Sequence, residues 1–196
     1  MPSEFPITAS DLARVNVVGV SGSGKSWFAS KLAGVLKTRY LQMDQLYWQP
    51  NWTEPTVEEF REIVRQAINQ ETWVLDGNYH SKTKDLKWEV TTLVVWIDQS
   101  FVATMWQAVT RAVHRAWTKQ ELWPGTGNRE SFRRSFFSTE SVVLWTLTTY
   151  HSARRRYLAV QKDADQMPFA FVRLRGRRAV AQFLESARQL HNEPLS

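Results

Sequence analysis

The chain has 196 residues, of which 43% are hydrophobic and 22% are charged, so it can bury one full apolar core and is too apolar for extended disorder. Cysteine is absent, which excludes disulfides and thiolate metal sites and suits a reducing compartment. The net charge of +6 favours an anionic partner, and a nucleotide polyphosphate, a phosphorylated metabolite and nucleic acid would all satisfy it.

Targeting and membrane segments are not evident. Residues 1–10 have no cationic start followed by an apolar core, and no later run approaches the roughly 18 apolar residues of a membrane span. We therefore expect a soluble, cytoplasmic protein without a membrane partner. No linker or internal repeat divides the chain, so residues 1–196 are expected to form a single domain.

The first predicted strand, residues 14–18, runs directly into Gly-Val-Ser-Gly-Ser-Gly-Lys-Ser at positions 19–26. This octapeptide fills every fixed position of the phosphate-binding pattern GxxxxGK[ST], known as Walker A, and a helical pattern follows it. Lys25 would reach the β and γ phosphates of a nucleoside triphosphate, and the Ser26 hydroxyl would ligate Mg²⁺. The residues expected to hold the phosphates are Gly19, Ser21, Gly22, Ser23, Gly24, Lys25 and Ser26.

Strands and helices alternate along the rest of the chain. Further strands are predicted at 40–43, 72–75, 93–97 and 169–174, and helices at 25–38, 56–68, 101–116, 142–161 and 180–190. Residues 45–55 read as a loop, and Pro124, Gly125 and Gly127 break the pattern in a region that we interpret as a lid insertion over about 118–138. The alternation predicts an α/β fold with a five-stranded parallel sheet covered on both faces.

Three aspartates follow predicted strands, namely Asp44, Asp76 and Asp98. Because the carboxyl ends of parallel strands open on one edge, these side chains should gather near the glycine loop. Either Asp76 or Asp98 could be the second magnesium-holding group, and Gly77 favours Asp76 because it allows close approach of the chain. Alternatively, each could cap a helix or a turn.

The run Trp73-Val74-Leu75-Asp76-Gly77-Asn78-Tyr79 resembles the Asp-Gly-Phe-Pro-Arg segment of adenylate kinases. The chain from about 15 to 184 is more closely similar to bacterial P-loop proteins described as adenylate kinase-like or topology modulation (FlaR-type) proteins. The shared segments are Met43-Asp44-Gln45-Leu46-Tyr47-Trp48, Asp76-Gly77-Asn78-Tyr79, Gly127-Asn128-Arg129-Glu130-Ser131 and Val172-Arg173-Leu174-Arg175. The resemblance implies a three-layer P-loop NTPase of the nucleoside-monophosphate-kinase type, in which the Asp76 strand lies beside the strand that precedes the glycine loop. ATP as the phosphoryl donor, with Mg²⁺, also comes from this likeness, as does a place for Arg175 beside the donor.

In kinases of that type, arginines of the lid and of its flanking helices hold the transferring phosphoryl group. Arg111 and Arg115 precede the lid here, one helical turn apart, and guanidinium groups suit phosphate geometry. The candidates beyond them are Arg129, Arg133 and Arg134, and then Arg154, Arg155 and Arg156. Alternatively, any of these arginines could lie on a solvated helix face.

Asp44 bears on the phosphoryl acceptor. A hydroxyl acceptor benefits from a carboxylate that orients it and takes its proton, as in small-molecule kinases of the shikimate and gluconate type. Asn78 and Tyr79 would face the same acceptor, and Tyr47, Trp48 and Trp52 could stack on it or anchor a loop. The sequence thus predicts an ATP- and Mg²⁺-dependent kinase that acts on a small-molecule or nucleotide acceptor. The alternatives are a nucleotide-responsive protein or slow NTPase that engages nucleic acid or protein through its basic lid, and a polynucleotide-end kinase.

Overall fold

A single parallel sheet forms the centre of the protein. The computed structural model describes residues 5–118, 121–123, 125–128 and 142–192. The strands are β1 (Arg14–Val18), β2 (Arg39–Gln42), β3 (Trp73–Asp76), β4 (Leu93–Ile97) and β5 (Ala170–Leu174). The helices are α1 (Lys25–Val35), α2 (Met43–Tyr47), α3 (Val57–Ile68), α4 (His80–Trp88), α5 (Phe101–Thr118), α7 (Val142–Lys162) and α8 (Gly176–Asn192). Short 3-10 turns are η1 (Ser10–Leu12), η2 (Pro50–Trp52) and η3 (Ala164–Gln166). The predicted α/β class is confirmed.

The strand order is β2-β3-β1-β4-β5, and all four pairings are parallel. β1 therefore lies at the centre, between β3 and β4, and Val17 is in register with Asp76. Strands β3 and β4 are buried throughout, because helices cover both faces of the sheet. The predicted five-stranded parallel sheet is confirmed, and so is the position of the Asp76 strand beside β1.

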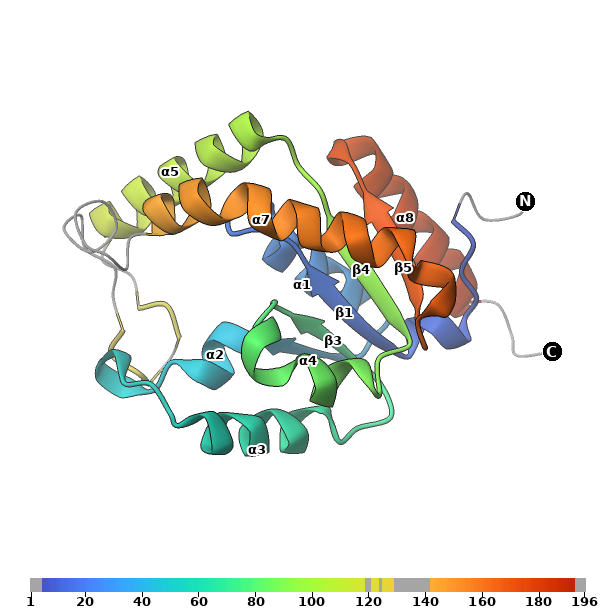
Figure 1. Cartoon of the computed structure of the whole chain (residues 1–196), viewed down its shortest axis with the longest axis horizontal. Helices are drawn as coiled ribbons and strands as arrows, with labels where there is room; N and C mark the ends of the chain where they lie inside the picture. Colours follow the sequence, from blue (N-terminus) through green and yellow to red (C-terminus); the bar gives the residue numbers. More distant parts are fainter. Residues whose placement is uncertain (1–4, 119–120, 124, 129–141, 193–196) are drawn as a thin grey trace.

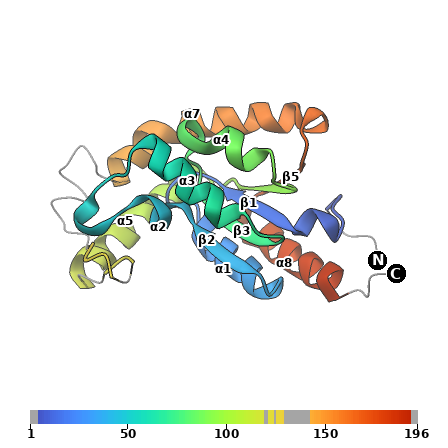
Figure 2. The ribbon, with the colours of Figure 1, turned by 90° about the horizontal axis from the view of Figure 1, so that it is seen from below.

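Helices form a layer on each face of the sheet, as Figures 1 and 2 show. On one face α1 and α8 pack together, and Phe28 meets Phe183 edge to face at 5.7 Å. On the other face α3 packs against β2 and β3, whereas α4 and α7 cover the side of the sheet that carries Trp96. The result is a three-layer arrangement with the apolar core on both sides of β1.

Two short helices differ from the sequence prediction. Residues 43–47 form α2 where we expected the end of a strand and a loop, and residues 80–88 form α4 where a lysine-rich segment gave no prediction. The buried side of α4 consists of Thr83, Lys87 and Trp88, and two of these three side chains are polar. An apolar periodicity therefore could not reveal this helix.

The predicted lid lies between α5 and α7, and residues 121–123 and 125–128 are its described part. Arg129, Arg133 and Arg134, which we predicted to bind phosphate, lie outside the described residues. Within the described part of the chain, every helix is too short or too polar to span a lipid bilayer.

Candidate functional site

The glycine loop and the predicted carboxylates lie at the carboxyl edge of the sheet. Residues 19–24 connect β1 to α1, Asp44 lies in α2 directly after β2, and Asp76 is the last residue of β3. Because the five strands are parallel, these ends open on the same side, and α1, α2 and the end of β3 lie around it in Figure 1. The residues that the sequence predicted to meet are therefore near neighbours in the fold.

The glycine loop has a main-chain shape that only glycine adopts at low cost. Gly22 and Gly24 have φ values of 82° and 86°. A Cβ at Gly22 would also lie 2.7 Å from the Thr104 carbonyl oxygen of α5, so the loop passes close to that helix. Gly24 is the N-cap of α1, and Lys25 and Ser26 begin the helix. A positive-φ turn that leads into a helix N-terminus is an anion-binding arrangement of main-chain amides.

Asp76 is a buried carboxylate beside this helix start. Its side chain accepts a hydrogen bond at Oδ2 from the Tyr40 hydroxyl at 3.2 Å, whereas buried Oδ1 has no hydrogen-bond partner among the described residues. Burial raises the pKa of Asp76, and the charge of Lys25 and the Ser26 hydroxyl oppose that rise. A carboxylate oxygen buried without a partner, next to a cation and a hydroxyl, fits a divalent cation that would also take the Ser26 oxygen.

Asn78 contacts the glycine loop, not the predicted acceptor side. Its Oδ1 accepts from the Gly19 amide at 3.1 Å, and its Nδ2 donates to the Gly19 carbonyl oxygen at 2.7 Å. The Tyr157 hydroxyl of α7 donates to the same Oδ1 at 2.7 Å and lies 2.7 Å from His80 Nε2. We predicted Asn78 to face the acceptor, but its amide is instead used to fix the main chain where the loop begins.

Lys87 is a fully buried lysine beneath the Asp76–Asn78 turn, and nothing in the sequence pattern indicated its burial. Its Nζ donates to the carbonyl oxygens of Gly77, at 3.1 Å, and Asn78. Burial lowers the pKa of Lys87 to about 7, and the charge of Asp76 partly opposes that shift. The lysine thus supports the Asp76–Asn78 turn from the protein interior.

This burial predicts a pH-dependent stability. In the unfolded chain Lys87 titrates near its ordinary pKa of 10.5, so between pH 7 and 10.5 the unfolded state binds more protons and stability rises with pH. Relative to Lys87→Met, we expect the free energy of unfolding of the wild type to increase by about 2 kcal/mol from pH 7 to pH 9. Urea denaturation of both proteins at the two pH values measures it. Parallel pH profiles would contradict the buried, neutralised lysine.

Arg111 reaches the glycine loop from α5. Its Nη2 donates to the Ser21 hydroxyl at 3.0 Å, so a guanidinium group lies at the rim of the loop. Arg115 follows one turn later on α5, with a half-buried side chain. The two arginines predicted to precede the lid are therefore on the face of α5 directed to the loop, and Arg111 contacts it.

The Asp98 carboxylate forms ion pairs with arginines. Its Oδ2 accepts from Arg173 Nε at 2.9 Å, and its Oδ1 accepts from Arg154 Nε at 3.2 Å. Arg175 Nε lies 4.0 Å from the same carboxylate, so this arginine, which the resemblance placed beside the donor, is near Asp98. These ion pairs join β4, β5 and α7, and they leave Asp76 as the carboxylate available to a metal.

Two other arginines that we predicted near the phosphoryl group, Arg155 and Arg156, are exposed.

The side chains predicted to meet the acceptor divide into two groups. Asp44 is exposed, and its Oδ1 accepts from the Tyr79 hydroxyl at 2.9 Å. Burial, and then the charge of Asp44, raise the pKa of Tyr79, which keeps that phenol protonated and donating. Tyr47 is instead a core residue, 4% exposed, and its hydroxyl donates to Glu54 at 2.6 Å. Trp48 is half-buried and packs edge to face on Tyr47, at 5.1 Å.

Asn128 connects the described part of the predicted lid to the loop after α2. This fully buried side chain accepts from the Trp52 amide at 2.8 Å and donates to the Gln49 carbonyl oxygen at 3.0 Å. The Asn51 amide donates to the Thr126 carbonyl oxygen at 3.3 Å, and Trp52 packs on Trp123. Asn128 lies in one of the segments that carry the resemblance but had no predicted role, because its partners lie more than 70 residues away in the sequence.

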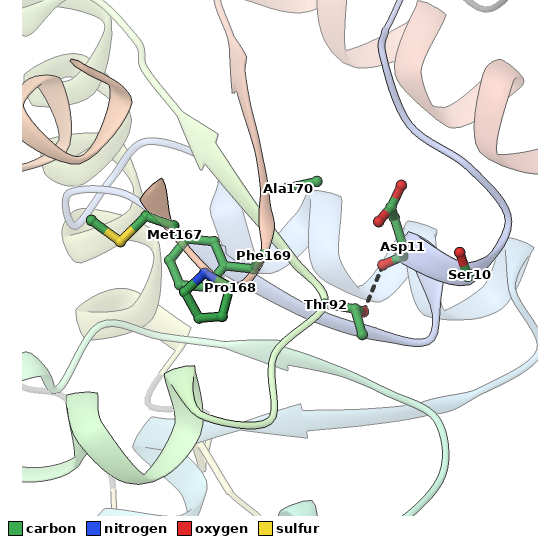
Figure 3. A pocket seen from close by; sticks show the side chains of 7 residues that line it. All are labelled: Ser10, Asp11, Thr92, Met167, Pro168, Phe169 and Ala170. Atoms are coloured by element: carbon green, nitrogen blue, oxygen red, sulfur yellow. Dashed lines mark hydrogen bonds between the residues drawn. The ribbon is translucent and has the colours of Figure 1, made fainter. Parts of the chain in front are cut away.

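Figure 3 shows the side chains that line a hollow of about 320 Å³. It is lined by residues of η1 and by residues at or just before the starts of β4 and β5, among them Thr92 and Phe169. The Asp11 carboxylate at its rim already accepts from the amide and the hydroxyl of Thr8. The hollow therefore does not belong to the site at the carboxyl ends of the strands.

No protein-family model matches the chain, and no curated protein matches it at a significant level.

Proposed function

We propose that this chain is a P-loop phosphotransferase, similar to nucleoside-monophosphate kinases and to the adenylate kinase-like topology modulation proteins. It transfers the γ-phosphoryl group of ATP to a small-molecule or nucleotide acceptor that presents a hydroxyl group. The observation that carries the proposal is the buried Asp76 carboxylate, with Oδ1 unpartnered within the described chain, beside Lys25 and Ser26 at the end of a glycine loop. A buried acid, a lysine and a helix N-terminus are together the parts of a metal-triphosphate site.

The donor would bind along the glycine loop. Main-chain amides around Gly22 and Gly24 and the Lys25 ammonium group neutralise its β and γ phosphates. Ser26 and Asp76 would hold Mg²⁺, which when bound offsets the charge that develops on the phosphates. Arg111, which donates to the Ser21 hydroxyl at the loop rim, would contact the transferring group.

The acceptor would lie on the Asp44 side. Its hydroxyl oxygen forms a bond to the γ-phosphorus while the bond from that phosphorus to the β-phosphate oxygen breaks, and ADP leaves. Asp44, exposed and held by Tyr79, accepts the proton that the hydroxyl loses.

A nucleoside-monophosphate acceptor would need cations on the Asp44 side. Of the arginines of α3, Arg61 instead forms a 2.7 Å ion pair with Asp85, and Arg65 pairs with Glu62.

The direct test incubates the purified chain with γ-labelled ATP and Mg²⁺ against a panel of nucleosides, nucleotides, sugars and hydroxy acids. We expect transfer to at least one hydroxyl compound of the panel. Slow hydrolysis without transfer, together with steeply salt-dependent oligonucleotide binding that survives Lys25→Ala, would favour the nucleotide-responsive binding protein instead. Competition by oligonucleotide 5′ ends would identify a polynucleotide-end kinase.

Asn78 acts in this scheme as a positioning residue. Asn78→Asp keeps the side-chain shape but replaces the amide donor to the Gly19 carbonyl oxygen with a carboxylate oxygen, which repels that carbonyl and a bound polyphosphate. We expect the affinity for ATP to fall roughly tenfold at pH 8. The ratio of wild-type to variant affinity should shrink as the pH falls, because the introduced carboxyl then regains a proton to donate.

Calorimetry at pH 8 and pH 5.5 measures this effect, and Asn69→Asp is the matched control because Asn69 is exposed at the end of α3. Tyr157→Phe, which removes the hydroxyl that orients the Asn78 amide, should weaken binding less than Asn78→Asp does. Equal ATP affinity for Asn78→Asp and Asn69→Asp would remove the positioning role and leave the proposed function standing.

A further inference from the structure

Helix α5 carries an apolar stripe that faces solvent. Val102, Trp106, Val113 and Trp117 are 76%, 71%, 42% and 80% exposed. Their spacing of four, seven and four residues places all four within an arc of about 60° on one side of the helix. Large exposed apolar side chains grouped on one surface indicate an interaction site, whereas isolated ones need no explanation.

The stripe faces away from the candidate site. Thr104 and Ala108 lie on the opposite side of α5 and contact Gly22 of the glycine loop, and Arg111 reaches Ser21 from that side. Helix α7 packs against α5, and in both views α5 lies at the periphery of the molecule (Figures 1 and 2). A partner bound to the stripe would therefore leave the loop accessible.

The stripe is complementary to itself when reversed. If two α5 helices lie antiparallel with the two-fold axis between Val109 and Thr110, Val102 lies opposite Trp117 of the second copy, and Trp106 lies opposite Val113. Each contact then joins a large side chain to a small one, and no ionisable group of the stripe is brought into the contact. A self-complementary patch is what a two-fold symmetric interface requires.

We infer that the chain forms a homodimer through α5, with the two helices antiparallel. Two copies bring four largely exposed tryptophans to the contact, and at roughly 150–250 Å² for each buried tryptophan they supply most of the needed area. A specific interface needs about 1,000 Å² in total. An interface near this lower limit predicts a reversible, concentration-dependent dimer. This inference does not depend on the proposed function.

Sedimentation velocity of the full chain across a range of concentrations tests the dimer. We expect the wild type to dimerise, and Trp106→Glu to raise the dimer dissociation constant at least about tenfold. Trp27→Glu is the matched control, because Trp27 is also an exposed tryptophan, 59% exposed, but lies on α1. A wild type that is monomeric at every concentration, or equal behaviour of the two variants, would overturn the inference.

The antiparallel geometry has its own test, because the chain contains no cysteine. Thr110 is exposed beside the inferred axis and would lie next to its own symmetry mate. Under mild oxidation, Thr110→Cys should form a disulfide-linked dimer, whereas Ser30→Cys, at an exposed position of α1, should not. Circular dichroism confirms that both variants are folded. A folded Thr110→Cys that fails to cross-link at concentrations where the wild type is dimeric would exclude this arrangement.

Discussion

Asp76→Asn is expected to lower the rate of phosphoryl transfer at least about 100-fold while the fold stays as stable as the wild type or becomes more stable. Asparagine has the same shape as aspartate but a neutral amide, which is a poor magnesium ligand. Asp76 is 6% exposed, so little space exists for another oxygen to replace the lost ligand. The expected loss of rate is therefore caused by loss of the metal ligand and not by unfolding.

The expected effect of Asp76→Asn on stability follows from the pKa of Asp76. Burial raises this pKa above its value in the unfolded chain, so the unfolded state loses its proton first and the ionised carboxylate disfavours folding. The unfavourable contribution is absent at low pH, grows as the pH rises through the unfolded pKa, and is fully present above the folded one. A neutral amide removes it. At pH 8, in the absence of metal, Asp76→Asn should thus melt no lower than the wild type.

Asp98→Asn is the matched control for this experiment. Asp98 also follows a strand and is buried, but it holds Arg173 and Arg154. Its neutralisation leaves a half-buried guanidinium group without its charge partner, so we expect a lower melting temperature and little specific change in rate. Steady-state assays with a magnesium titration and thermal melts distinguish the two patterns. Retention of full magnesium-dependent activity by Asp76→Asn would contradict the assignment of the metal ligand.

Most of the fold could be predicted because it is encoded locally. The strands and the long helices, including α3 with its capping box between Thr56 and Glu59, appear as short-range patterns. The helix α4 could not be predicted, because its buried face includes Thr83 and Lys87, whose side chains donate to main-chain carbonyl oxygens and do not pack as apolar groups. Buried polar groups that are satisfied by hydrogen bonds leave no apolar periodicity in the sequence.

The candidate site could likewise be predicted only where its residues belong to local motifs. The glycine loop and the aspartate at the end of β3 are local motifs, and the sheet brings them together as expected. The role of Asn78 depends on Gly19 and on Tyr157, which are 59 and 79 residues away in the sequence. The ion pairs of Asp98 likewise come from β5 and α7, so a motif alone could not distinguish it from Asp76.

Lys25→Met is the second change with a large expected effect. Lys25 is the first residue of α1, directly after Gly24, and its charge already acts on Asp76. Methionine keeps a chain of similar length that can pack along the helix, but it removes the ammonium group that would contact the phosphates as they separate. We expect kcat/KM to fall about 100-fold or more, because loss of one positioned charge or donor at a reacting group has that size.

Binding provides a readout that does not require the acceptor to be known. At a concentration 100 times its Kd, MgATP stabilises a folded protein by about 2.7 kcal/mol, which corresponds to a rise in Tm of roughly 5–10 °C for a chain of this size. The wild type should show this shift, and Lys25→Met should lose most of it. Lys31→Met is the control, because Lys31 lies on the exposed side of the same helix and should keep the full shift. If both variants respond to MgATP as the wild type does, the glycine loop is not the triphosphate site. Loss of the shift in Lys25→Met alone would instead locate the triphosphate at this helix start, whichever acceptor receives the phosphoryl group.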